Sequence, residues 1–281
     1  MKQCFYELRQ PRTAELLRLI FAAAILLAIM IAGVACREQA LATDFTRKNL
    51  APCAEYLFGT DWMGRDMFTR TLSGLSLSIR IGVVTAAVSA VVALSAGVSA
   101  ALLGRWADSA LTWLIDLFMG IPHILLLVLI SCACGRGFWG VTIGIVATHW
   151  MSLARLIRGE VMQLRQSGYV QVARKLGASP AAIAARHILP GVLPQFFTGL
   201  VLLFPHAILH EASVTFLGFG LTSEQPAVGV ILSESMQYLA TGRWWLALLP
   251  GLCLVAVVLL FELAGKSLAA LWAVNAEQEA A

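Results

Sequence analysis

The chain has 281 residues, of which 59% are hydrophobic and only 13% are charged. Soluble domains carry about 25% charged residues, so this composition excludes an ordinary soluble domain and, with a mean hydropathy of +0.80, predicts a bilayer protein. The net charge of +4 is small, and its lysines and arginines are dispersed without an aromatic ladder, which excludes a nucleic-acid-binding face.

Six apolar runs predict six transmembrane helices, each near the roughly 20 residues that a bilayer crossing needs. They are expected at 17–36, 81–103, 111–133, 138–157, 192–216 and 244–264. Helices are expected because backbone polar groups in lipid must be satisfied within their own segment. We therefore expect an all-α polytopic membrane protein whose transmembrane domain covers 17–264. Its connecting parts are a tail at 1–16, an outer loop at 37–80, a polar loop at 158–191 and a tail at 265–281.

Lysine and arginine in short loops indicate which side of the membrane is cytoplasmic. The tail at 1–16 and the loop at 158–191 are both basic, so we expect them, and both termini, in the cytoplasm. The outer loop also holds basic residues, so lysine and arginine occur on both sides of the expected membrane. It also holds Cys53, and whether this residue pairs with Cys36 stays open.

The outer loop contains a compact charged motif, Phe58-Gly-Thr-Asp-Trp-Met-Gly-Arg-Asp66. Asp61, Arg65 and Asp66 can form ion pairs around two glycine turns. These side chains either contact a partner subunit or a docked binding protein, or they fold the loop itself.

The polar loop contains the most informative segment, GYVQVARKLGASPAAIAARHILPGVLP at 168–194. Gly177 predicts a turn that needs positive φ or a close backbone approach, and Pro180 suits the first turn of a following helix. We expect two short helices around this turn. The alternative is an ordinary basic loop on the membrane surface.

The fifth span carries ionisable residues that are costly in a bilayer. His206 and His210 share one helical face at i, i+4 spacing, with Glu211 beside them. We expect this face to line a translocation path and to contact a cationic or chelated metal transiently, since imidazole suits nickel, copper and zinc. Two histidines cannot complete a stable metal site. The alternative is pairing with a neighbouring helix, and His123 and His149 are expected to be packing or interface residues.

Two apparent catalytic motifs fail on their spacing. Gly265-Lys266-Ser267 ends like a phosphate-binding loop, but Leu260 occupies the position of its first glycine. His210-Glu211 begins like a zinc-protease motif, but Val214 replaces the second histidine. The sequence therefore predicts no ATP site and no protease, and a membrane hydrolase lacks a nucleophile–base pair.

Several segments resemble ABC importer permeases. The polar loop is similar to their EAA loop, E-A-A-x3-G-x9-I-x-L-P, and has Ala173, Gly177, Leu189 and Pro190 in place. It departs from the motif at three positions, with Gln171 for the glutamate, Val172 for the first alanine and His187 for the isoleucine. The charged outer motif resembles that of C-type subunits of dipeptide, oligopeptide and nickel importers. Together the matches span about 57–264, whereas the stretch 262–268 departs from the subfamily.

The resemblance implies a type I ABC importer permease fold in the bacterial inner membrane, surrounded by lipid. The implied partners are a homologous B-type permease, two cytoplasmic ATPases and an extracytoplasmic substrate-binding protein. ATP and Mg would bind the ATPases, so this subunit would need no cofactor. The residues implied in ATPase coupling are Gln171, Ala173, Gly177, Leu189 and Pro190. Within the subfamily, the fifth-span histidines favour nickel or a nickel chelate, most like the nickel permeases, and a peptide importer is the alternative.

Overall fold

The computed structural model describes the backbone of residues 2–280 and the side chains of 12–100 and 104–272. Its backbone is almost wholly helical, which confirms the all-α expectation. The long helices are α1 (Lys2–Ala35), α3 (Met67–Leu103), α6 (Gly137–Gln166), α9 (Leu189–Phe216) and α11 (Trp245–Ala280). The shorter ones are α2 (Arg37–Leu41), α4 (Arg105–Met119), α5 (His123–Ala133), α7 (Gly168–Lys175), α8 (Pro180–Ile183) and α10 (Val228–Leu239). Single 3-10 and π turns lie at Phe45–Arg47 and Ala184–Ile188.

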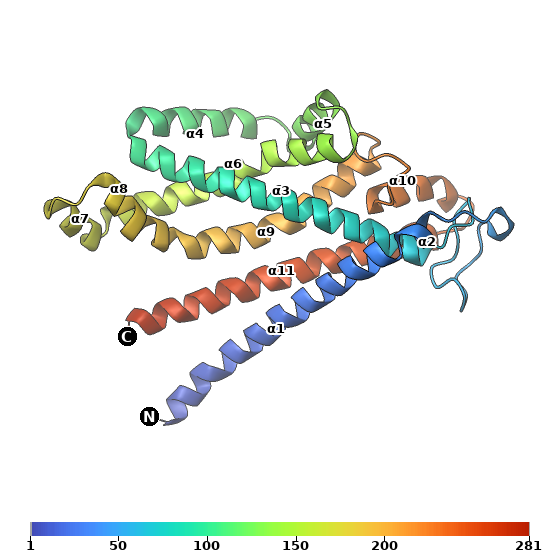
Figure 1. Ribbon diagram of the computed structural model, residues 1–281, viewed down its shortest axis with the longest axis horizontal. Helices are drawn as coiled ribbons and strands as arrows, with labels where there is room; N and C mark the ends of the chain where they lie inside the picture. The colour runs from blue at the N-terminus through green and yellow to red at the C-terminus, as the bar shows by residue number, and fades with distance from the viewer. Residues whose placement is uncertain (1, 281) are drawn as a thin grey trace.

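The centre of the bundle is α3, which packs against both α6 and α9 (Figure 1). Helices α1 and α11 run beside one another and cover one side of this centre. Apolar side chains of α1 remain exposed, among them Leu17 at 66% and Ile20 at 61%. Backbone groups of a helix are paired internally, so such an apolar surface is suited to lipid.

Five described helices are long and apolar enough to cross a bilayer, or six if α4 and α5 count as one bent span. The third span expected at 111–133 is broken in the structure, because α4 and α5 meet at 94°. Pro122 explains the break: it has no N–H to donate, and it disfavours helical geometry at Ile121.

Helix α3 begins at Met67, well before the expected residue 81. Asp66 caps it by accepting hydrogen bonds from the backbone N–H groups of Phe68 and Thr69, both at 3.2 Å. Residues 67–80 therefore belong to the helix rather than to the outer loop. Cys36 and Cys53, at the two sides of this loop, are free thiols.

Helix α6 extends into the expected polar loop as far as Gln166, and α9 already begins at Leu189. Helix α11 continues past residue 264, the expected end of the last span, as one helix to Ala280. Helix α10 was not expected. Helices α7 and α8 lie at the same end of the molecule as the start of α1 and the end of α11 (Figure 1). Helices α2 and α10 lie at the opposite end.

Candidate coupling segment, cavity and outer ion network

Residues 167–188, the coupling segment, form two short helices on either side of a glycine turn. Gly177 has φ of +84°, a conformation that side chains with a Cβ rarely adopt. Ser179 caps α8 by accepting a hydrogen bond from the N–H of Ala182 at 3.2 Å, and Pro180 occupies the first turn. The expected helix–turn–helix arrangement is therefore present.

One side of the coupling segment is anchored in the bundle. Val170 and Ile188 are fully buried and Ile183 is 4% exposed. They share a hydrophobic cluster with Ile157 and Val161 of α6. The coupling segment is therefore close-packed against α6 and α9.

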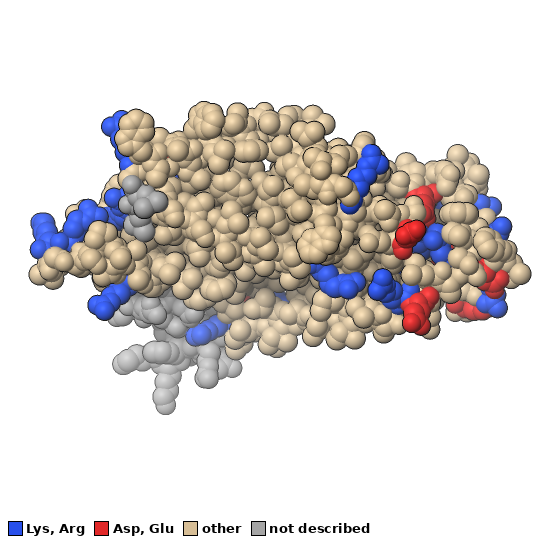
Figure 2. Space-filling model, turned by 45° about the horizontal axis from the view of Figure 1, so that its top comes forward, with Lys and Arg blue, Asp and Glu red and all other residues tan. Residues whose placement is uncertain are grey.

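The other side of the coupling segment exposes apolar groups. Leu176 is 82% exposed, Val172 56% and Tyr169 50%. Arg174 and Lys175 end α7, and the face drawn in Figure 2 shows several basic side chains at this end. A contiguous apolar surface with a polar border is typical of a protein interaction site.

The residues expected to couple to an ATPase divide between these two sides. Ala173 is partly buried against the hydrophobic cluster. The exposed ones are Gln171, Gly177, Leu189 and Pro190, of which the last two begin α9.

A cavity of about 620 Å³ lies where the break between α4 and α5 faces α6 and α9. His206 and His210, which share one face of α9, both line it. His123 and His149 line it too, although the sequence assigned them to packing. The cavity therefore gathers four of the five histidines of the chain.

Three of these histidines touch one another. The ring centroids of His123 and His210 lie 4.4 Å apart, and those of His149 lie 4.9 and 5.0 Å from them. His149 Nε2 is 3.2 Å from His210 Nδ1. His210 also contacts the backbone carbonyl of His206 on its own helix at 2.8 Å, but the His206 ring lies outside this group.

Glu211 does not line the cavity. It is fully buried and accepts hydrogen bonds from the hydroxyls of Ser78 at 2.6 Å and Thr215 at 3.0 Å. Successive residues point about 100° apart around a helix, so Glu211 faces α3 when His210 faces the cavity. Its observed role is to join α9 to α3.

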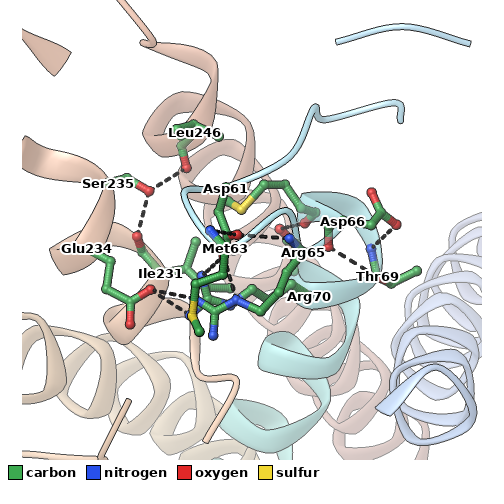
Figure 3. Close-up of polar contacts among 12 residues, drawn as sticks. Asp61, Met63, Arg65, Asp66, Thr69, Arg70, Ile231, Glu234, Ser235 and Leu246 are labelled. Atoms are coloured by element: carbon green, nitrogen blue, oxygen red, sulfur yellow. Dashed lines mark hydrogen bonds and ion pairs between the residues drawn. The ribbon is translucent and has the colours of Figure 1, made fainter. Parts of the chain in front are cut away.

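A buried ion network lies at the end of the molecule opposite the coupling segment (Figure 1 and Figure 3). Asp61 Oδ2 lies 2.6 Å from Arg65 Nε and 2.9 Å from Arg70 Nη1. Glu234 Oε2 of α10 lies 2.7 Å from Arg70 Nη2 and 3.2 Å from Arg65 Nη2.

Two arginines thus neutralise two carboxylates, and the network ties the outer loop to α3 and α10. Of the residues expected to contact a partner, Asp61 and Arg65 are 4% and 6% exposed and point into this network, and Asp66 caps α3. These contacts favour the loop-folding interpretation. The pairing of Arg70 with Glu234 was not expected from the sequence, since the two residues are 164 positions apart in the chain.

The fold and sequence match known membrane proteins. Residues 93–272 match the family model of the binding-protein-dependent transport system inner membrane component. A chain of the methionine ABC transporter MetNI in inward-facing form aligns with a TM-score of 0.62, over 74% of this chain and 97% of that one. Its sequence identity is 19%, so this likeness concerns the fold alone.

Relatives in sequence carry peptide-transport names. A Brucella suis biovar 1 protein, provisionally named a peptide transport system permease, is 35% identical over 87% of this chain and 82% of its own length. The dipeptide transport system permease protein DppC of Alkalihalophilus pseudofirmus is 31% identical over 95% of this chain and 87% of its own. DppC of Bacillus subtilis is 30% identical over 80% of this chain and 70% of its own length.

These relatives are membrane permeases rather than ATPases. The chain accordingly belongs to the binding-protein-dependent inner membrane components, the non-catalytic permease subunits of bacterial ABC importers.

Proposed function

We propose that this chain is the permease subunit of an importer for short peptides, in which it forms half of the translocation path. The substrate class is supported by the relatives, which carry peptide- and dipeptide-transport names over most of this chain. A homologous permease would supply the other half of the path, and an extracytoplasmic binding protein would deliver the peptide.

The coupling role is supported by one observation: the coupling segment is buried in the bundle on one side and exposed on the other. Val170 and Ile188 anchor it in the core, while Leu176 stands 82% exposed at its tip. A cytoplasmic ATPase subunit would cover the exposed side. ATP and Mg would bind the ATPases, whose closure would push on the segment and reorient α6 and α9 between outward- and inward-facing states.

This role fixes the orientation. The coupling segment would face the cytoplasm, and the start of α1 and the end of α11 lie at the same end of the molecule (Figure 1). Both termini would therefore be cytoplasmic. The basic residues of the segment agree with the excess of lysine and arginine on that side of bacterial inner membranes.

A second candidate substrate is nickel or a nickel chelate. The specific observation in its favour is the cavity that collects His123, His149, His206 and His210. Imidazole is a preferred ligand of nickel, copper and zinc, whereas a peptide path has no evident need for four of them.

Uptake by cells separates the two substrates. A strain lacking the gene would be complemented with the wild-type chain and given a labelled dipeptide or labelled nickel. Complementation of dipeptide uptake is the expected result, and excess unlabelled dipeptide should compete. Restored nickel uptake without restored dipeptide uptake would transfer the assignment to the metal.

A further inference from the structure

We propose that His123, His149 and His210 form a binding site for a divalent first-row transition metal ion. The site joins α5, α6 and α9 at the wall of the cavity. It goes beyond peptide import and does not depend on it, because the argument rests on the three imidazoles alone.

The spacing of the three side chains suits one ion. Each offers a ligand nitrogen, and the three nitrogens lie within 4.8 Å of one another. Metal–nitrogen bonds of about 2.0–2.1 Å place two ligands of a tetrahedral site about 3.3 Å apart. The two rings are adjacent, since His149 Nε2 lies 3.2 Å from Nδ1 of the His210 ring. A rotation of the His210 ring that turns its Nε2 toward His149 would complete the set.

The backbone hydrogen bonds of two rings leave one unprotonated nitrogen on each. His149 Nδ1 lies 3.0 Å from the carbonyl oxygen of Ile145, and His210 Nδ1 lies 2.8 Å from that of His206. A carbonyl only accepts, so each neutral ring carries its proton on Nδ1 and keeps a lone pair on Nε2. A backbone carbonyl that holds the other nitrogen is the usual support of a metal-binding histidine.

The third ring supplies an independent observation. His123 Nε2 is buried and has no hydrogen-bond partner among the described residues. An unsatisfied buried polar atom is costly, so a structural role alone does not account for it. A metal ion shared with His149 and His210 would satisfy it.

The ligand set also selects the ion. Three imidazoles suit nickel, cobalt, copper or zinc, whereas magnesium and calcium prefer oxygen. Glu211, the residue after His210 on α9, is hydrogen-bonded to Ser78 and Thr215 and contributes no oxygen to the group. Three protein ligands leave at least one coordination position open, and the cavity gives external ligands access to it.

The test uses the assembled importer, purified through a tag without histidine, stripped of metal and titrated with Cu²⁺. Electron paramagnetic resonance should show a bound ion coupled to imidazole nitrogens. His149→Gln and His210→Gln should each weaken Cu²⁺ binding by at least about tenfold, the scale of losing even a supporting partner. Two matched controls should bind as wild type: His187→Gln, in the coupling segment, and His206→Gln, in the cavity but outside the group.

Yield and thermal midpoint of each variant show whether it assembles. If His149→Gln or His210→Gln fails to assemble, His123→Gln is tested instead. The Nε2 atom of His123 has no hydrogen-bond partner within the described chain, so this substitution removes no hydrogen bond of that atom. Absence of imidazole coupling in the wild-type spectrum would overturn the proposal, as would equal loss in His187→Gln. ATP-driven dipeptide uptake by the same preparation reports on the proposed function separately: uptake without metal binding would refute only the metal site.

Discussion

Arg70 of α3 and Glu234 of α10 form a 2.7 Å ion pair although they are 164 positions apart in the chain. The Arg70 side chain is 2% exposed, and it forms a second ion pair with Asp61 of the outer loop. The outer loop, α3 and α10 are thus joined by charges that are already paired inside this subunit. Asp61 and Arg70 are for that reason poor candidates for direct contact with a delivered peptide.

Asp61→Asn should destabilise the outer end strongly. It leaves Arg65 and Arg70 with Glu234 as their one remaining carboxylate in the network, and breaking a buried pair by removing one partner costs roughly 3–5 kcal/mol. The check is the thermal midpoint of the purified importer. Glu55→Gln is the control, because its ion pair with Arg47 is exposed and should contribute little. Equal midpoints for both variants would contradict the structural role of the network.

Leu176→Glu should detach the ATPase while leaving the spans folded. Burying a leucine is worth about 1.5–3 kcal/mol, so affinity for the ATPase should fall at least about tenfold. The measurement is co-purification of the ATPase with this chain. Leu57→Glu is the matched control, since Leu57 is also an exposed leucine, at 58%, but lies in the outer loop. Normal ATPase recovery with Leu176→Glu would remove the docking assignment.

Substitutions of Gly177 should separate backbone strain from obstruction of docking. The described chain brings no heavy atom within 4 Å of a Cβ at this position, but φ is +84°. Alanine should cost only about 1–2 kcal/mol of local strain and keep most coupled transport. Tryptophan adds bulk on the exposed side and should uncouple ATP hydrolysis from uptake. The ratio of peptide imported to ATP hydrolysed measures this, and equal ratios for both variants would argue against a docked partner there.

Gln171→Glu should be tolerated. Gln171 is exposed on α7, and both side chains can accept a hydrogen bond from a donor on the ATPase. Uptake within about twofold of wild type is expected in the assay used for Gly177. Complete loss of uptake would mean that the segment is used in another register.

Gly97→Ala should weaken the contact between α3 and α6. A Cβ there would lie 2.8 Å from the carbonyl oxygen of Ala154 and 2.9 Å from Ile157, so the helix backbones would have to separate. Gly159→Ala on α6 is the control, since nothing described lies within 4 Å of its Cβ position. Alanine is about 1 kcal/mol better than glycine in a helix, so the control should not lower the thermal midpoint.

The sequence predicted the features that depend on local pattern. Apolar runs located the helices of the bundle, and Gly177 with Pro180 predicted the turn between α7 and α8. The bend at Pro122 was missed because the apolar run continues across it. Hydropathy measures whether residues suit lipid, and it does not measure whether the helix axis stays straight.

The site depended on contacts between distant segments, which one sequence does not display. His123 and His149 were assigned to packing because each stands alone in its own segment, yet the fold brings both to His210. The available signal was that ionisable residues within spans are functional candidates by default. Glu211 shows the opposite case, since Ser78 holds it away from the cavity.

The most direct test of the central claim is ATP-driven peptide accumulation in proteoliposomes. The vesicles would contain this chain with its partner permease and ATPases, and the binding protein and a labelled dipeptide would be added on the opposite side from ATP. The account predicts accumulation that requires hydrolysable ATP and that Leu176→Glu abolishes. Accumulation that is independent of ATP, or unchanged by Leu176→Glu, would contradict it.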